Sequence, residues 1–177
     1  MMESAELLMP VSERDHIQGT EDAPVTLVEY GDFECPYCGM AYPIIKDVQE
    51  QLGDRLRFVF RNFPITTSHP HAQHAAESAE AAGAQGSYWE MHDTLYENQE
   101  TLADEHLRGF AEQLGLDMEQ FERDMTEHRH EGRVREDFMS GVRSGVGGTP
   151  TFYINGLRYD GRWTEGQLLK ALEHALR

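Results

Sequence analysis

Cysteine is scarce in this sequence, and long apolar runs are absent. Only two of the 177 residues are cysteine, and a chain of this length buries enough surface to fold without a disulfide or a metal ion. Those two cysteines therefore need a chemical explanation. No segment approaches the ~18 uninterrupted apolar residues that a membrane span requires. We expect one globular domain, or one domain with a sizeable insertion, and no membrane partner.

Positive charge is also scarce. Lys and Arg together number 15 against 32 Asp and Glu, which gives a formal net charge of −17, and Lys46 and Lys170 are the only lysines. A field of this sign repels phosphate backbones and anionic headgroups, so we expect no nucleic acid partner. The acidic surface fits both ordinary solubility and adaptation to high salt, and the sequence does not choose between them.

The N-terminal segment lacks the features of a secretory signal peptide. Glu3 and Glu6 stand where such a peptide carries Lys or Arg, and the apolar run is short. We therefore expect a cytoplasmic protein. The doubled methionine at the start leaves open that a longer leader was trimmed.

Hydrophobic periodicity indicates an α/β fold in the first part of the chain. Residues 25–30 form a β-branched apolar segment, apolar positions recur at helical spacing from Cys38 to Leu52, and alternation from Leu56 to Phe60 indicates a second strand. Because a helix connects these strands, they should pair in parallel. We assign residues 13–66 to the first half of this fold.

Residues 67–144 are predicted to form an all-helical insertion, and residues 145–177 the second half of the α/β fold. Three segments of the insertion carry helical apolar faces, namely Tyr88, Met91, Leu95 and Tyr96, then Leu107, Phe110, Ala111 and Leu114, then Met118, Phe121 and Met125. Asp117 with Gln120 is typical of a helix N-cap, as is Thr164 with Gln167 before the last helix. Two short strands at 151–155 and 157–159 precede that helix.

The two cysteines stand three residues apart, as Cys35-Pro36-Tyr37-Cys38 at the predicted strand-to-helix junction. A C-x-x-C motif beside a βαβ unit is typical of redox chemistry. Unpaired N–H groups and the helix dipole should lower the pKa of Cys35, and proline suits the first helical position. The spacing predicts an exposed nucleophile, Cys35, and a shielded resolving thiol, Cys38.

Metal binding and a structural disulfide are the alternatives for the cysteines. A zinc site needs about four ligands, and no second C-x-x-C or Cys/His pair has finger-like spacing. A disulfide closing so small a loop stabilises little. His69, His71 and His74, without a supporting carboxylate pattern, indicate a solvated helix terminus, and His128 and His130 are interpreted as surface residues. We predict no metal and no cofactor beyond the cysteine pair.

The whole pattern resembles the DsbA-like branch of the thioredoxin superfamily. The resemblance rests on the sequence VTLVEYGDFECPYC from Val25 to Cys38, on the helical block, and on GTPTF from Gly148 to Phe152. It covers the chain from about His16 onward. It implies a thioredoxin fold (βαβ…ββα) with an all-helical insertion, a redox-active Cys35/Cys38 pair and a cis peptide bond before Pro150.

The resemblance also implies roles around the pair. Glu29 matches a buried acid of the superfamily, whose raised pKa would make it a proton acceptor for Cys38 through a water. A solvent-facing glutamate is the alternative. The backbone of Thr149, beside Pro150, would pair with an extended substrate segment.

Aromatic residues near the cysteines offer candidate substrate contacts. Phe33, Pro36 and Tyr37 flank the nucleophile directly, and we expect them to touch substrate. A second set could line a peptide groove or pack in the core, and we favour the core for its members, which are Tyr88, Trp89, His92 and Tyr96.

Two departures bear on the direction of electron flow. The strongly oxidising periplasmic member of the family has histidine where this chain has Tyr37, and Glu34 beside Cys35 should push the thiol pKa upward. Both argue for a less oxidising pair. Thr149 before Pro150 is more similar to disulfide isomerases and cytoplasmic relatives, so the direction stays open.

The sequence therefore predicts a monomeric thiol-disulfide oxidoreductase that acts on protein or peptide thiols and disulfides and is served by a separate redox partner. The alternative is a redox-sensing or binding module, in which the Cys35–Cys38 pair changes state without turnover of a substrate.

Overall fold

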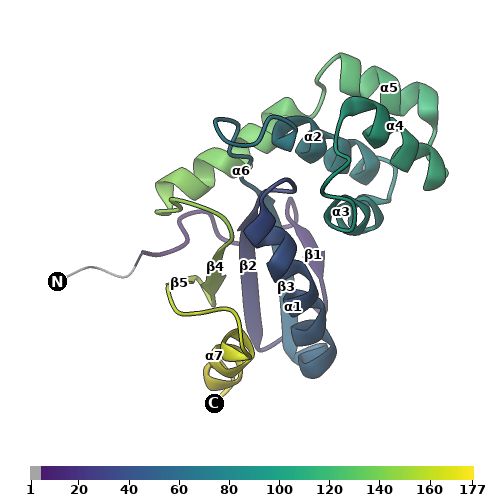
Figure 1. The fold of residues 1–177 in the computed structure, drawn as a ribbon. Helices are drawn as coiled ribbons and strands as arrows, with labels where there is room; N and C mark the ends of the chain where they lie inside the picture. Colours follow the sequence, from purple (N-terminus) through teal and green to yellow (C-terminus); the bar gives the residue numbers. More distant parts are fainter. Residues whose placement is uncertain (1–4) are drawn as a thin grey trace.

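The computed structural model, which describes residues 5–177, contains a five-stranded sheet in the order β1-β3-β2-β4-β5 (Figure 1). Its strands are β1 (His16–Gln18), β2 (Val25–Gly31), β3 (Leu56–Asn62), β4 (Thr151–Ile154) and β5 (Leu157–Tyr159). The pair β2 and β3 is parallel, as predicted, and every other pair is antiparallel. Strand β1 was not predicted, because three residues are too few to show a period.

Seven α-helices and one 3-10 turn complete the described part of the chain. They are α1 (Pro36–Leu52), η1 (Gly53–Arg55), α2 (Ala72–Gly83), α3 (Tyr88–Tyr96), α4 (Asp104–Gln113), α5 (Met118–Thr126), α6 (Glu131–Arg143) and α7 (Gln167–Ala175). Helices α2 to α5 gather beyond one end of the sheet, and α6 leads back from them toward β4 (Figure 1). Within residues 5–177, no helix combines the length and apolar character needed to cross a bilayer.

The sheet separates two apolar cores. Val25 and Leu27 of β2 belong to the core beneath α1 and α7, whereas Val28 and Tyr30 belong to the other, which packs against α6. Because side chains alternate along a strand, Glu29 lies on the same side as Val25 and Leu27. The strand therefore directs this carboxyl group toward α1, the helix that carries the cysteines.

Most residues on the apolar faces predicted for the helical block are buried in the structure. Tyr88, His92 and Tyr96 of α3 are buried, and Trp89 is partly buried against the same core, so the core interpretation holds fully for three of the four aromatic residues. Helix α2 runs beside α3 and presents a row of small buried alanines to its neighbours. The block forms a lid over the end of the sheet at which β2 meets α1 (Figure 1).

The two predicted N-caps have different outcomes. The Asp117 carboxylate accepts a hydrogen bond from the Gln120 N–H at 3.1 Å, as expected. The capping box at Thr164 is wrong. Glu165 and Gly166 adopt left-handed backbone conformations, so α7 begins only at Gln167, whose N–H donates to the backbone carbonyl of Thr164.

Candidate active site at the start of helix α1

Cys35 occupies the N-cap of α1, and the helix begins at Pro36. The Cys35 N–H donates to the Asp32 carbonyl at 3.1 Å, and the Gly39 N–H donates to the Cys35 carbonyl at 3.0 Å. These bonds join the end of β2 to the first turn of α1. Neither cysteine is in a disulfide, and the Cys35 sulfur accepts hydrogen bonds from the backbone N–H groups of Tyr37 and Cys38 in that turn.

The pKa of Cys35 is lowered to about 5. The largest cause is a hydrogen bond from the Cys38 side chain, which outweighs the opposing effect of burial. Thr149 and the backbone N–H groups of Tyr37 and Cys38 lower the pKa further. A thiol with this pKa is a thiolate at neutral pH, and thiolates are the nucleophiles of disulfide exchange.

Cys38 has the opposite character. Its side chain is fully buried, and burial raises its pKa well above the ordinary value. The hydrogen bond to Cys35 and the charge of Glu29 act in the same direction. The pair therefore consists of one thiolate and one thiol, which are the two forms that disulfide exchange uses.

Glu29 is buried, which excludes the solvent-facing alternative. Burial raises the pKa of its carboxyl group to about 8, and the Cys35 thiolate adds to the shift. A cavity of about 10 Å³ borders Glu29, and His92 and Tyr96 of the lid also line it. The His92 Nε2 and Tyr96 hydroxyl atoms lack hydrogen-bond partners within residues 5–177. A cavity of that size holds about one water molecule.

Two expectations about exposure are wrong. Cys35 is only 4% exposed rather than open to solvent, because the loop at Thr149 lies against it, with the Cys35 Sγ 3.6 Å from the Thr149 carbonyl oxygen, to which only the protonated thiol can donate. Phe33 is 1% exposed and packs, with its ring tilted, against Phe60 and Tyr96, so it is a core residue and not a substrate contact.

Exposed positions beside the nucleophile are supplied by α1 itself. Pro36 and Tyr37 are both exposed, Tyr37 at 62%, and Met40 one turn later is 55% exposed. These side chains form an exposed rim on the first turns of α1, next to Cys35.

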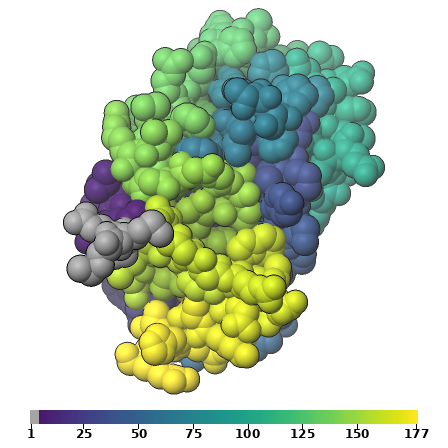
Figure 2. Space-filling view, turned by 60° about the vertical axis from the view of Figure 1, so that its left-hand side comes forward, coloured from purple at the N-terminus to yellow at the C-terminus, as the bar shows by residue number. Residues whose placement is uncertain are grey.

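The predicted cis peptide bond between Thr149 and Pro150 is confirmed. A hollow of about 440 Å³ borders this loop, with Pro150, Tyr159 and Trp163 among its lining residues. In Figure 2 the yellow-green segment that contains the loop lies on the surface between α6 and the yellow C-terminal helix α7. The loop is therefore accessible along one side while its other side covers Cys35.

Asp32 is a buried site residue that sequence reasoning missed. Its carboxylate accepts hydrogen bonds from the N–H groups of Glu34 and Ile65, at 2.8 and 2.9 Å, and lies 2.7 Å from His69 Nδ1. It fixes the loop before Cys35 to the segment after β3. The Gly-Asp pair directly after a strand is a turn signal that could have revealed it.

The expected influence of Glu34 on Cys35 is not realised. The Glu34 carboxylate accepts a hydrogen bond from the His71 N–H at 2.7 Å, and the pKa of Cys35 is lowered in spite of this neighbour. Of the three histidines considered for metal binding, His69 pairs with Asp32 and His74 with Asp104, so they serve separate contacts.

Gln99 is the second site residue that the sequence did not reveal. Its side-chain amide, on the segment between α3 and α4, donates to the carbonyls of Phe33 and Cys35 at 2.9 Å each. A Cβ atom on Gly39 would lie 2.0 Å from the Gln99 Oε1, so the absence of a side chain there admits the contact. One lid residue thus holds both ends of the nucleophile loop.

Replacing Gln99 with alanine should lower the free energy of unfolding by about 1–2 kcal/mol, because its two hydrogen bonds to the carbonyls of Phe33 and Cys35 are lost. Urea unfolding measures the loss. Gln113→Ala, at an exposed position on α4, is the matched control. Equal losses in the two variants would contradict this role.

The alkylation rates of Cys35 and Cys38 should depend on pH in different ways. Alkylation of Cys35 by iodoacetamide should follow an apparent pKa of about 5, while Cys38 should stay unreactive in the folded protein up to pH 9. Mass spectrometry of peptides after timed alkylation measures both rates. An apparent pKa near that of a free cysteine, about 8.5, would refute the described electrostatics.

The chain is similar both to a protein-family model and to part of several longer curated proteins. A family model described as thioredoxin matches residues 11–174. Among curated proteins, an Na⁺/H⁺ antiporter of Salinispora arenicola is 46% identical over 171 residues, which cover 96% of this chain and 26% of the antiporter. The chain spans about a quarter of the length of the curated relatives it matches.

Solved structures give the same fold over nearly the whole chain. BdbD from Bacillus subtilis, in its oxidised form, superposes with a TM-score of 0.84 and 24% identity over 98% of this chain and 99% of that one. A thioredoxin-like oxidoreductase from Silicibacter pomeroyi has a TM-score of 0.78 and 27% identity over 93% of each chain. The DsbA-like α/β fold with a helical insertion is thereby confirmed.

Proposed function

This chain belongs to the thioredoxin family, and from that premise we propose that it exchanges dithiol for disulfide with protein or peptide substrates, with Cys35 as nucleophile and Cys38 as resolving thiol. One observation carries the proposal. The Cys35 thiolate, with a pKa of about 5, accepts a hydrogen bond from the buried Cys38 thiol beside the Thr149 loop. Such a pair has the groups that both steps of disulfide exchange require.

The proposed exchange proceeds in two balanced steps. The Cys35 thiolate attacks one sulfur of a substrate disulfide, forms a mixed disulfide, and releases the other substrate sulfur as a thiolate that takes a proton from solvent. Cys38 then gives its proton to ionised Glu29 and attacks the Cys35 Sγ. This forms the Cys35–Cys38 disulfide and expels the second substrate thiolate, which is protonated in turn. Two electrons have passed to the substrate, and the reverse sequence oxidises it.

The exposed side chains at the start of α1 and the loop at Thr149 would position the substrate. Thr149 and Pro150 are half-buried beside Cys35 and border the accessible hollow. An extended substrate segment would pair with the Thr149 backbone as a short added strand. Pro36 and Tyr37, exposed on α1, would contact the residues next to the substrate sulfur.

We expect the pair to be more oxidising than thioredoxin. Stabilising the Cys35 thiolate stabilises the reduced protein, which raises the tendency of the disulfide form to accept electrons. Tyr37, which brings no positive charge, should keep the pair below the strongest oxidants. A reduction potential between about −270 and −120 mV is expected, measured by equilibration in glutathione buffers and alkylation. A value below that range would favour a reductase.

Turnover of a protein substrate tests the proposal directly. The protein should reduce insulin disulfides with a chemical reductant and oxidise a reduced substrate with an oxidant, in both cases far above the background rate. Cys35→Ser supplies the background, since it removes only the nucleophilic sulfur. No rate above that variant in either direction would refute turnover.

A second candidate is a redox-sensing module. The observation that favours it is the set of curated relatives named Na⁺/H⁺ antiporters, in which the matched segment fills about a quarter of the chain. In this case the Cys35–Cys38 pair would report redox state to an ion transporter without turning over a substrate. A module of this kind should bind such a transporter differently in its two redox states and should fail the insulin assay.

A further inference from the structure

A second cluster of metal-ligating side chains lies in the lid, outside the dithiol site. It consists of His74 and Glu77 on α2 and of His128 in the turn between α5 and α6. One potential ligand atom from each residue lies within 4.8 Å of the others. We propose that His74, Glu77 and His128 bind a divalent transition-metal ion of the zinc class, which joins α2 to the α5–α6 turn.

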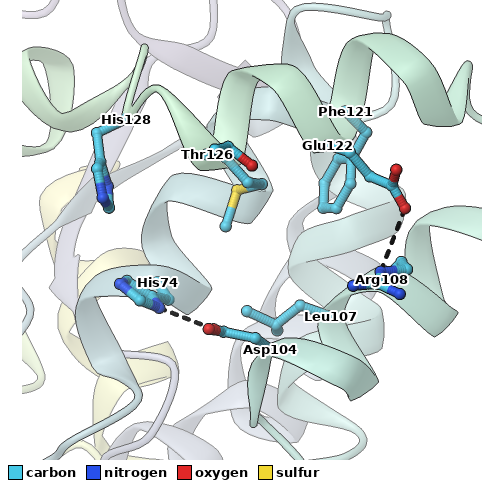
Figure 3. Close-up of a pocket in the computed structure, with 9 residues that line it drawn as sticks. His74, Asp104, Leu107, Arg108, Phe121, Glu122, Thr126 and His128 are labelled. Atoms are coloured by element: carbon cyan, nitrogen blue, oxygen red, sulfur yellow. Dashed lines mark hydrogen bonds and ion pairs between the residues drawn. The ribbon is translucent and has the colours of Figure 1, made fainter.

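The spacing on α2 supports this site. His74 and Glu77 are three residues apart, so they project from the same face of the helix. His128 comes from 51 residues further along the chain than Glu77, and its Nδ1 lies 3.0 Å from the Glu77 Oε1. Figure 3 shows the His128 ring extending from the end of α5 toward the His74 ring on α2.

The Glu77 carboxylate is buried and lacks a permanent positive partner. It is 2% exposed, and its oxygens meet the amide of Gln73 at 3.1 Å and the His128 ring. Among residues 5–177, no lysine or arginine forms an ion pair with it. A buried carboxylate is costly unless it is paired or coordinates a metal, and a bound cation would supply the missing charge.

An outer carboxylate orients one of the imidazoles. Asp104 lies 2.7 Å from the His74 Nδ1, as the dashed line in Figure 3 marks. That contact leaves the Nε2 of His74 as the metal-binding nitrogen. Metal-ligating histidines in proteins commonly hold a carboxylate on their other nitrogen in this way, which fixes the ring and raises its basicity.

The donor set selects the class of ion. Two imidazoles and one carboxylate suit zinc and its neighbours, whereas calcium and magnesium require mostly oxygen ligands. Metal bonds near 2.1 Å place tetrahedral ligands about 3.4 Å apart, so ligand atoms that lie within 4.8 Å of one another must close by at most roughly 1.4 Å. His128 can supply that movement because its side chain is 49% exposed.

His74 and His128 also line a hollow of the lid, which an open coordination position on the ion would face. This hollow has a volume of about 350 Å³, and Asp104, Leu107 and Phe121 lie in its wall with the two histidines (Figure 3). A water molecule there would complete four-coordination. The proposed metal site shares no residue with the dithiol site. Because its ligands come from α2 and from the turn between α5 and α6, the ion would hold these parts of the lid together.

Zinc titration of the Cys35→Ser/Cys38→Ser protein tests the proposal, since that background removes the thiolates that would also bind zinc. Calorimetry should show one saturable zinc ion per chain and a melting temperature that rises with zinc. His128→Ala and Glu77→Gln should each weaken binding by about 100-fold or more, and Asp104→Asn by about 10–100-fold.

His106→Ala is the matched control, because His106 is a half-exposed histidine of the lid that lies outside the cluster. It should bind zinc as the parent does. Circular dichroism and cooperative melting show that each variant is folded, and the exposed position of His128 makes His128→Ala the safer of the two ligand variants. Zinc uptake that does not saturate, or equal affinity in His128→Ala and His106→Ala, would overturn the site.

Discussion

Cys35→Ser should lose all turnover, whereas Cys38→Ser should stop after one exchange and accumulate a mixed disulfide with close to one substrate per chain. The difference follows from the electrostatics of the pair, in which Cys35 is the thiolate and Cys38 the buried thiol. Without Cys35 no sulfur of low pKa remains. Without Cys38 the first attack still occurs, but no second thiol expels the substrate. Non-reducing mass spectrometry measures the trapped species.

The choice of replacement at Cys38 gives a sharper control. The Cys38 side chain is the largest cause of the lowered pKa of Cys35. A serine hydroxyl still donates a hydrogen bond to the thiolate, whereas alanine does not. Cys38→Ala should therefore show a higher apparent pKa for Cys35 alkylation than Cys38→Ser. Identical alkylation profiles, or a Cys38→Ser protein that traps no substrate, would contradict the assigned roles.

Short-range patterns predicted the parts of the site that one strand and one helix build. The strand ending at Gly31 and the proline at the first helical position place Cys35 at the N-cap of α1. The two-residue period of β2 places Glu29 under α1. These features depend on neighbours in the sequence, so local reasoning was sufficient for them.

The missed features depend on how the lid docks. Gln99 reaches the carbonyl of Cys35 from 64 residues away, and the burial of Phe33 follows from its packing against α3. No periodicity encodes such contacts, because they arise only once the insertion has closed over the sheet. The exposure of Cys35 was overestimated because the Thr149 loop, which is 114 residues further along the chain, lies against it.

The lid histidines illustrate the same limit. His74 was set aside for want of a supporting carboxylate, although Glu77 stands three residues later on the same helical face. The third member, His128, is brought to them by the turn after α5. The helical spacing was visible in the sequence, but the tertiary contact that completes the cluster was not.

Glu29→Gln should stabilise the protein and slow its chemistry. The folded state holds the Glu29 proton up to a pH of about 8, because burial raises the pKa of the carboxyl group, whereas the unfolded state releases it near pH 4.5. The folded state therefore binds more protons between these values, and its stability falls as the pH rises through that window. Glutamine carries no such proton, so its advantage should grow to a few kcal/mol by pH 8.

The same substitution removes the proposed proton acceptor of Cys38. In the parent protein, the rate at which the mixed disulfide is resolved should rise with pH toward about 8. Glu29→Gln should lose that rise, and its rate at pH 8 should be about 10²-fold lower. Urea unfolding at pH 5 and pH 8 measures the change in stability, and stopped-flow exchange measures the change in rate. Glu50→Gln, at an exposed position on α1, is the matched control. Burial of Glu29 alone accounts for the gain in the free energy of unfolding, whereas only proton transfer by Glu29 accounts for the pH dependence of the exchange rate. A Glu29→Gln protein that gained stability but kept that pH dependence would therefore show that Glu29 does not accept the Cys38 proton.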